Sequence, residues 1–448
     1  ILSSDRMESD PLVIIGGAAV SLNPEPIAEL MDLFIIGDGE GVTLELVERY
    51  RENGGRGALS SYASIAGVYV PSLYEVTYDG AQIKEVKAAK GAPEKVKAGK
   101  FSDIDKFPMP KTAIITADTS FANTVLMEIE KGCGRFCRFC AAGFLYLPPR
   151  WRDFEMVKDS MKIALKEFGK VGLVGAAVSE YPRLKELLAI GAELKGNLTL
   201  SSIRADVIDP ELLTLLRQCG YKTLTIAPEA GTERGRHIIN KCMSEEVILN
   251  AARMASEAGF QKLKLYFLAG LPEETDEDVL AIAGLTEKIR GEFGKGQITV
   301  SINPFIPKAV TPFQWFPYER VDTLEKRFKM VKKALLALKG VKVSIFSPRQ
   351  AFFQAVIARG DRRLAQVIID ASMNYNGSLK RALKANKECV PSAEEYAYRE
   401  RGEREILPWD ILDHAIEKDY LYKEYQRGLE AKETGPCIVG ACTRCGVC

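Results

Sequence analysis

The chain contains 448 residues, with 61 Lys and Arg against 60 Asp and Glu, so its formal charge is +1. Hydrophobic residues make up 46% and charged residues 27%, a composition that excludes a disordered or collagen-like chain. The balanced charge gives no strong signal for nucleic-acid binding and none for a polybasic membrane anchor. Because the sequence shows neither a long apolar run nor a signal-peptide pattern, we expect a cytoplasmic protein without a membrane-spanning helix.

The first hundred residues predict a small α/β domain. Apolar runs at 11–15 and 33–36 each end at glycines and are followed by helical patterns, as in a doubly wound parallel sheet. Two strands do not make a stable parallel sheet, so we expect part of this domain to be missing or to pair elsewhere. Residues 74–88 predict a hairpin around Asp79 and Gly80, and residues 87–111 a linker with solvated lysines.

A regular alternation of strands and helices follows from about residue 123. One helix is predicted over Asp153–Phe168, with Asp153 as its cap and Gly169 as its end. The predicted strands are 125–130, 171–177, 198–204, 222–227, 262–268 and 297–303. Six such units predict a partial (β/α)6 barrel, whose chemistry lies at the carboxyl ends of the strands. After about residue 340 we expect a helical, cysteine-ended region, so the predicted domains are 1–112, 113–340 and 341–448.

Ten cysteines indicate metal sites. Seven of them lie in two tight groups, and Cys219, Cys242 and Cys389 are isolated, which predicts packed thiols. Tight groups in a large chain are typical of metal binding in a reducing compartment and not of a disulfide framework.

The first group, Cys133, Cys137 and Cys140, follows the first barrel strand with C-x3-C-x2-C spacing. Three thiolates on one loop can hold three irons of a 4Fe–4S cluster and leave the fourth iron open. Zinc and plain core thiols are the alternatives; zinc would need a fourth ligand, and neither His237 nor His414 has ligand spacing. Lys131, Arg135 and Arg138 are expected to favour the thiolates.

These residues resemble the motif of the radical S-adenosylmethionine (SAM) superfamily, with Phe139 at its aromatic position, and the resemblance covers roughly residues 120–340. It implies that SAM chelates the open iron, and that an electron releases methionine and a 5′-deoxyadenosyl radical. An electron donor of the flavodoxin or ferredoxin type is implied. The three cysteines are the predicted catalytic residues.

The resemblance also implies SAM contacts at the other strand ends. The segment around Gly175 and Ala176 departs from the family's Gly-Gly-Glu-Pro, so its contact is expected to use backbone carbonyls. Arg204 and Arg236 are predicted partners of the SAM carboxylate. The remaining predicted contacts are Phe139, Ser201, Glu229, Gly270 and Leu271.

The second group, Cys437, Cys442, Cys445 and Cys448, resembles ferredoxin-type ligands. A second 4Fe–4S cluster is the prediction, with zinc and a redox-sensitive disordered tail as alternatives. Four protein ligands leave no open iron, which favours electron transfer or a structural role.

The segment from Gly16 to Glu40 resembles the second half of the cobalamin-binding domain that precedes many radical SAM enzymes. The resemblance implies cofactor contacts at Gly16, Gly17, Ser21, Gly37, Gly39 and Glu40. The cobalt-ligating Asp-x-His-x-x-Gly motif is absent; it belongs to the first half of that domain, which the start at Ile1 predicts to be missing. Bound cobalamin and a vestigial structural domain are both open at this point.

Three hypotheses follow. The whole layout resembles poorly characterised radical SAM proteins with a cobalamin-binding domain, which favours a cobalamin-dependent C-methyltransferase acting on an unactivated carbon of a peptide or protein. The second is a cobalamin-independent enzyme that uses the C-terminal cluster for redox chemistry, C–C bond formation or methylthiolation of RNA or protein. The third is an assembly protein with a degenerate barrel, against which the intact Cys133, Cys137 and Cys140 argue.

Overall fold

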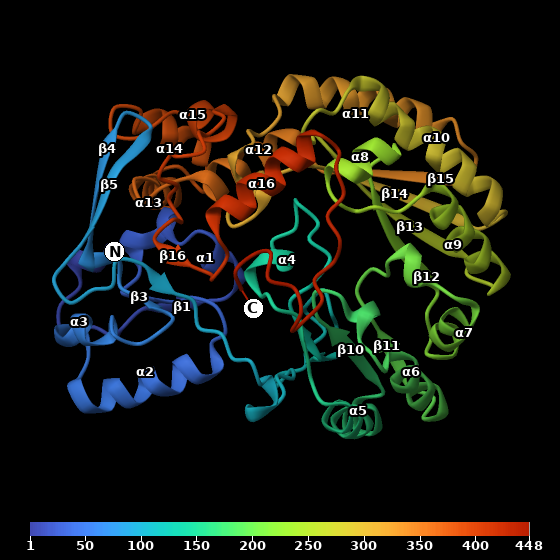
Figure 1. Cartoon of the computed structure of the whole chain (residues 1–448), viewed down its shortest axis with the longest axis horizontal. Helices are drawn as coiled ribbons and strands as arrows, with labels where there is room; N and C mark the ends of the chain where they lie inside the picture. Colours follow the sequence, from blue (N-terminus) through green and yellow to red (C-terminus); the bar gives the residue numbers. More distant parts are fainter. Residues whose placement is uncertain (448) are drawn as a thin grey trace.

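The computed structural model describes residues 1–447 and contains an α/β domain, an open barrel and a helical C-terminal region (Figure 1). The N-terminal domain has three core strands, of which β1 and β2 pair in parallel and β3 pairs with β2 antiparallel. The predicted parallel pairing of the first two strands is therefore confirmed, and the antiparallel third strand is one that the sequence did not indicate. Its elements are β1 (Ile14–Gly16), α1 (Ala18–Leu22), β2 (Leu33–Ile35), α2 (Glu40–Asn53), α3 (Leu59–Tyr62) and β3 (Val68–Tyr69).

The hairpin predicted around Asp79 and Gly80 is present as β4 (Tyr74–Asp79) and β5 (Gln82–Ala88). The segment after it is not a plain linker. Its strand β6 (Val96–Lys97) pairs in parallel with β16 (Leu412–Asp413), so this segment joins the N-terminal domain to the C-terminal region.

Seven parallel strands form the barrel. One sheet has the order β11-β10-β7 and the other β12-β13-β14-β15, and the amide of Ile203 links them by donating to the carbonyl of Thr225 at 3.0 Å. The seventh strand lies beyond residue 340, where only helices were expected. The strands are β7 (Val125–Glu128), β10 (Lys170–Val174), β11 (Asn197–Thr199), β12 (Thr223–Glu229), β13 (Lys262–Ala269), β14 (Gln297–Pro304) and β15 (Val341–Ile345).

The outer helices follow the amphipathic patterns of the sequence. Asp153 caps the predicted helix by accepting from the amide of Met156, and Gly169 ends it in the left-handed conformation. Buried aliphatic side chains from these helices and the strands form one large core. The helices are α5 (Phe154–Phe168), α6 (Leu184–Glu193), α7 (Pro210–Gln218), α8 (Glu233–Ile238), α9 (Glu245–Glu257), α10 (Asp276–Phe293) and α11 (Val321–Leu336).

The C-terminal region lies between the other two parts. Arg362 pairs with Glu25 of the N-terminal domain at 2.8 Å, and α16 crosses the open side of the barrel (Figure 1). The end of the chain therefore returns to the barrel mouth. The helices of this region are α12 (Pro348–Arg359), α13 (Leu364–Asn374), α14 (Leu379–Ala385), α15 (Ala393–Tyr398) and α16 (Lys418–Leu429).

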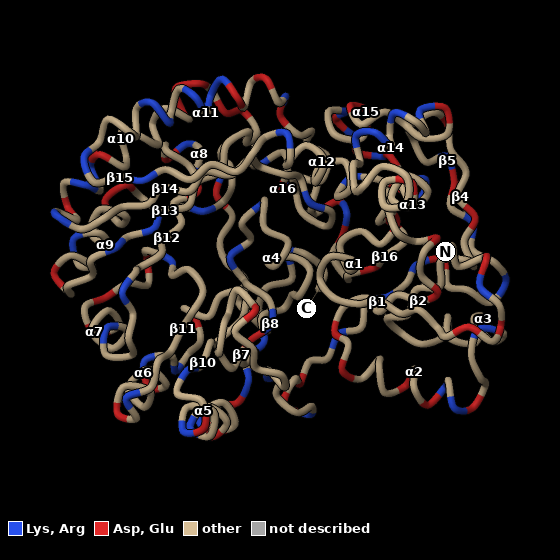
Figure 2. Tube along the Cα trace, turned by 180° about the vertical axis from the view of Figure 1, so that it is seen from behind, with Lys and Arg blue, Asp and Glu red and all other residues tan. Residues whose placement is uncertain are grey.

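Basic and acidic residues alternate along the outer helices (Figure 2). Among residues 1–447, no helix is long and apolar enough to span a membrane.

Candidate active site at the barrel mouth

The loop that carries the first three cysteines begins at the carboxyl end of β7. A short ladder between β8 (Glu130–Lys131) and β9 (Arg150–Trp151) holds its base. Gly132 has a φ of +83°, and a Cβ there would lie 2.3 Å from the carbonyl oxygen of Tyr146. Only glycine fits this close approach, so the loop leaves the strand in a defined direction.

The three thiols lie near one another, with Cys137 buried and Cys133 and Cys140 half-buried. Burial raises the pKa of Cys133 to about 12 and that of Cys137 to about 11, and the neighbouring cysteines add to both shifts. The amide of Arg135 points at the sulfur of Cys133, and those of Ala142 and Gly143 at the sulfur of Cys140. Bound iron would deprotonate the three thiols, and the backbone amides would stabilise the negative charge of the resulting thiolates. The residues therefore fit a cluster with one open iron.

The basic residues of the loop pair with carboxylates and not, as predicted, with the thiolates. Lys131 contacts Glu40 at 2.6 Å and Asp38 at 3.4 Å, and both carboxylates belong to the N-terminal domain. Arg135 contacts Glu180 at 2.6 Å. These side chains therefore tie the loop to surrounding elements.

Arg138 also pairs with a carboxylate, and its side chain is fully buried. It pairs with Glu424 of α16 at 3.0 Å and donates to the carbonyls of His237, Ile238 and Lys432 at 2.9, 3.0 and 2.7 Å. One residue of the cluster motif thus holds α8, α16 and the C-terminal segment together.

Three charged residues lie near the sulfur of Cys137. Lys241 and Arg204 lower its pKa and Glu229 raises it. Glu229 accepts from Lys241 at 2.9 Å and has a φ of +69°, an uncommon conformation for a non-glycine residue that is typical of functional sites. Arg204 donates two hydrogen bonds of 2.9 Å to Asp206. The structure therefore places the predicted Glu229 and Arg204 near the sulfur of Cys137, each paired with a residue of opposite charge.

The other predicted SAM contacts are arranged differently. Arg236 is buried and donates to the carbonyls of Met243, Ala230 and Gly231, so its guanidinium holds the turn after β12 in place of the predicted carboxylate contact. Ser201 is exposed beyond the end of β11. The amide of Gly270 donates to Glu274 at 2.6 Å, whereas Leu271 packs in the aromatic core beneath the cluster loop with Phe139 beside it.

A cavity of about 510 Å³ separates the cluster loop from the N-terminal domain. The domain contributes the ends of its parallel strands, and the barrel contributes the ends of β7 and β10. Its glycine lining is Gly16, Gly17, Gly37, Gly39, Gly132 and Gly175, and Ala176, Glu130 and Tyr146 also face it.

The glycines of this cavity have two different roles. A Cβ at Gly37 would lie 2.3 Å from the carbonyl oxygen of Gly99, and one at Gly175 would lie 2.2 Å from Glu130 Cγ, so internal packing requires both. At Gly17 a Cβ would meet nothing within 4 Å, and at Gly39 nothing nearer than 3.8 Å, so these two leave room for a ligand.

Two other N-terminal residues named by the resemblance brace this cavity. The hydroxyl of Ser21 is buried and accepts from the amide of Gly37 at 2.9 Å. Glu40 neutralises Lys131.

Burial raises the pKa of Glu130, on the barrel side, to about 7, and the charges of Glu180 and Glu128 act in the same direction. A carboxyl group that titrates near neutrality therefore faces the cavity.

The C-terminal cysteines lie against the first cluster loop. The amide of Cys437 donates to the carbonyl of Gly134 at 2.7 Å, and Cys437 and Cys133 line one small cavity. Cys445 is buried in the same aromatic core as Phe136, and Arg444 donates to the sulfur of Cys442 at 3.2 Å. The fourth predicted ligand, Cys448, lies outside the described residues.

The scattered cysteines differ from one another. Cys219 is a packed thiol as predicted, but Cys389 is exposed, so that prediction is wrong. Cys242 is half-buried and faces His237, a neighbour that the sequence spacing did not indicate. Lys241 was also missed, since nothing in its sequence context distinguishes it from a surface lysine.

Comparisons with known proteins match both the cluster loop and the N-terminal domain. The Radical SAM superfamily model matches residues 127–286, and the model for the N-terminal region of radical SAM proteins matches residues 1–71. The uncharacterized protein MJ0966 of Methanocaldococcus jannaschii is 33% identical over 86% of this chain and 79% of its own length.

Two more distant similarities involve proteins of stated activity. A ribosomal protein uS12 methylthiotransferase of Treponema denticola is 26% identical over 36% of this chain and 40% of its own length. A radical SAM methyltransferase, TsrM, of Kitasatospora setae superimposes with a TM-score of 0.45 at 15% identity, over 67% of this chain and 56% of that one.

The fold, the cysteine loop and the matched models agree: the chain belongs to the radical SAM superfamily. It is a radical SAM enzyme, a class that uses a 4Fe–4S cluster and SAM.

Proposed function

We propose that this enzyme is a cobalamin-dependent C-methyltransferase that binds cobalamin in the cavity between the N-terminal domain and the barrel. The cavity of about 510 Å³ carries the proposal, because the openings at Gly17 and Gly39 face the side of the barrel that holds the cluster. It lies between two domains, a position typical of cofactor and ligand sites. When bound, SAM and cobalamin would supply the radical and the methyl group.

The residues of the chain would position these groups and exclude water. The pairs Glu229–Lys241 and Arg204–Asp206 would orient the amino and carboxylate groups of SAM beside Cys137. Lys131 and Arg150, both bound to Asp38, would hold the N-terminal domain closed over the mouth. We further propose that the substrate is a carbon of a peptide or protein, and that a flavodoxin- or ferredoxin-type protein donates the electron.

Gly39→Leu tests the cofactor assignment. A leucine at this position would fill the open part of the cavity, because its nearest neighbour would be Thr43 Oγ1 at 3.8 Å. We expect the wild-type protein, purified anaerobically and incubated with hydroxocobalamin, to retain about one corrin per chain after desalting. The variant should retain little corrin but still cleave SAM.

Gly284→Leu is the matched control, since Gly284 is an exposed helical glycine with nothing within 4 Å of its Cβ position. It should bind corrin like the wild type. A wild-type protein that carries a full cluster and retains no corrin would contradict the proposal.

A second candidate function rests on the contact between Cys437 and Gly134. This contact supports an auxiliary cluster beside the SAM cluster, as needed for redox chemistry or methylthiolation. We expect reconstituted protein to hold about eight irons per chain, and Cys437→Ala/Cys442→Ala/Cys445→Ala about four. Cys389→Ala, at an exposed position, is the control. Equal iron in the wild type and the triple variant would exclude the second cluster.

A further inference from the structure

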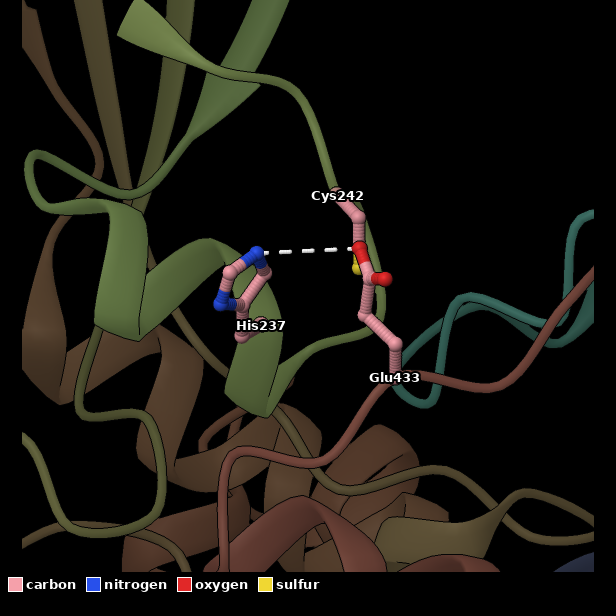
Figure 3. Close-up of side chains that lie close together, drawn as sticks. All are labelled: His237, Cys242 and Glu433. Atoms are coloured by element: carbon pink, nitrogen blue, oxygen red, sulfur yellow. Dashed lines mark ion pairs between the residues drawn. The ribbon is translucent and has the colours of Figure 1, made fainter.

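Three side chains with metal-binding atoms meet beside a cavity that Arg135 and Arg204 also line, and they belong to neither cysteine group. His237 lies at the end of α8, Cys242 follows in the next loop, and Glu433 lies in the segment between α16 and the C-terminal cysteines (Figure 3). One ligand atom from each lies within 4.8 Å of the other two, and His237 Nε2 is 3.6 Å from Glu433 Oε1. Sequence spacing could not reveal this group, because Glu433 comes from a distant part of the chain.

Hydrogen bonds from two buried side chains, Asn240 and Arg138, hold the backbone that carries these side chains. Asn240 accepts from the amide of Thr434 at 2.8 Å and donates to its carbonyl at 3.0 Å, which fixes Glu433 beside Cys242. Arg138 donates to the carbonyl of His237 at 2.9 Å. The backbone on which His237 and Glu433 lie is therefore held in place, so their side chains can reach Cys242.

The site is also accessible. The side chains of His237 and Glu433 are 42% and 60% exposed, so an ion can enter from solvent. A cavity of about 180 Å³ adjoins Cys242 and Glu433 and has room for water as a further ligand. The set of one thiolate, one imidazole and one carboxylate combines the donor types that Zn²⁺ prefers, with a fourth position left for water.

We propose that His237, Cys242 and Glu433 bind one Zn²⁺ ion, and that this ion fastens the segment carrying the C-terminal cysteines to the barrel. Glu433 precedes Cys437, whose amide contacts the first cluster loop at Gly134. Zinc at this point would hold that contact in place. The inference does not depend on cobalamin binding or on the reaction catalysed.

Metal analysis of the anaerobically purified, iron-reconstituted protein tests this site. After incubation with a small excess of zinc chloride and desalting, we expect about one zinc per chain in addition to iron. His237→Asn and Glu433→Gln should lose most of this zinc without a change in iron. Glu430→Gln, on a nearby exposed residue that pairs with Lys432, should keep it.

The triple variant Cys437→Ala/Cys442→Ala/Cys445→Ala separates this site from the C-terminal cysteines. It should retain the zinc. Cobalt(II) is a second probe: we expect a thiolate charge-transfer band that disappears in Cys242→Ser and persists in Cys389→Ser. Absence of zinc from the wild type, or zinc that stays in Glu433→Gln and leaves with the triple variant, would overturn the proposal.

Discussion

Cys137→Ser is expected to reduce the cleavage of SAM to 5′-deoxyadenosine to the level of iron-free protein. Cys137 is the most deeply buried of the three loop cysteines, and the other two cannot hold three irons without it. A serine hydroxyl is a poor ligand for iron because it does not ionise at neutral pH. The measurement is the amount of 5′-deoxyadenosine formed by reduced, reconstituted protein, together with its iron content.

Two cysteines provide matched controls for this result. Cys389→Ser changes an exposed thiol, and Cys219→Ser changes a buried thiol that donates to the carbonyl of Leu188 at 3.2 Å. Both variants should keep their cluster and their activity. If Cys137→Ser cleaved SAM as fast as these controls, the loop would not be the catalytic cluster site.

Arg138→Met is expected to lower the free energy of unfolding by about 3–5 kcal/mol, the usual cost of breaking a buried ion pair. Glu424 is only 4% exposed and would keep its charge without the 3.0 Å partner. The carbonyls of His237, Ile238 and Lys432 would also lose their donor. Because Arg138 lies between Cys137 and Cys140, we expect iron content to fall as well.

A double variant separates the charge from the packing. Arg138→Met/Glu424→Leu removes both charges and should recover part of the lost stability, since no buried carboxylate is then left with the partly exposed Arg427 as its ion-pair partner at 3.4 Å. Arg253→Met is the surface control, at a residue 52% exposed whose contact with Glu257 is 3.6 Å, and should change stability by less than about 0.5 kcal/mol. Calorimetry of the iron-loaded proteins gives the comparison. A cost for Arg138→Met no larger than this control would contradict the proposed role of Arg138.

Local sequence patterns predicted the barrel and its helices well. The cap at Asp153 acts within one helical turn, and the alternation of strands and helices is read from neighbouring residues. The third strand of the N-terminal sheet and the seventh barrel strand were missed. Val68–Tyr69 is too short to show a period. Val341–Ile345 follows Gly340 and alternates apolar and polar residues, a strand signal that the prediction overlooked.

The candidate site could be predicted only in part. The spacing of Cys133, Cys137 and Cys140 predicts the cluster loop, because all three cysteines lie within the eight residues 133–140. The partners of the charged residues could not be predicted in this way. Arg138 contacts Glu424, and Lys131 contacts Asp38, only after elements far apart in the sequence pack together. The tertiary packing therefore decides which ion pairs form.

The sequence by itself determined the family and the barrel and predicted the cluster ligands, since each depends on residues close together in the chain. Only the tertiary structure decided where the end of the chain lies. It brings Cys437 to Gly134 and Glu433 to His237 and Cys242. The physical reason is that burial of Arg138 and Asn240 fixes the returning segment through hydrogen bonds between residues far apart in sequence.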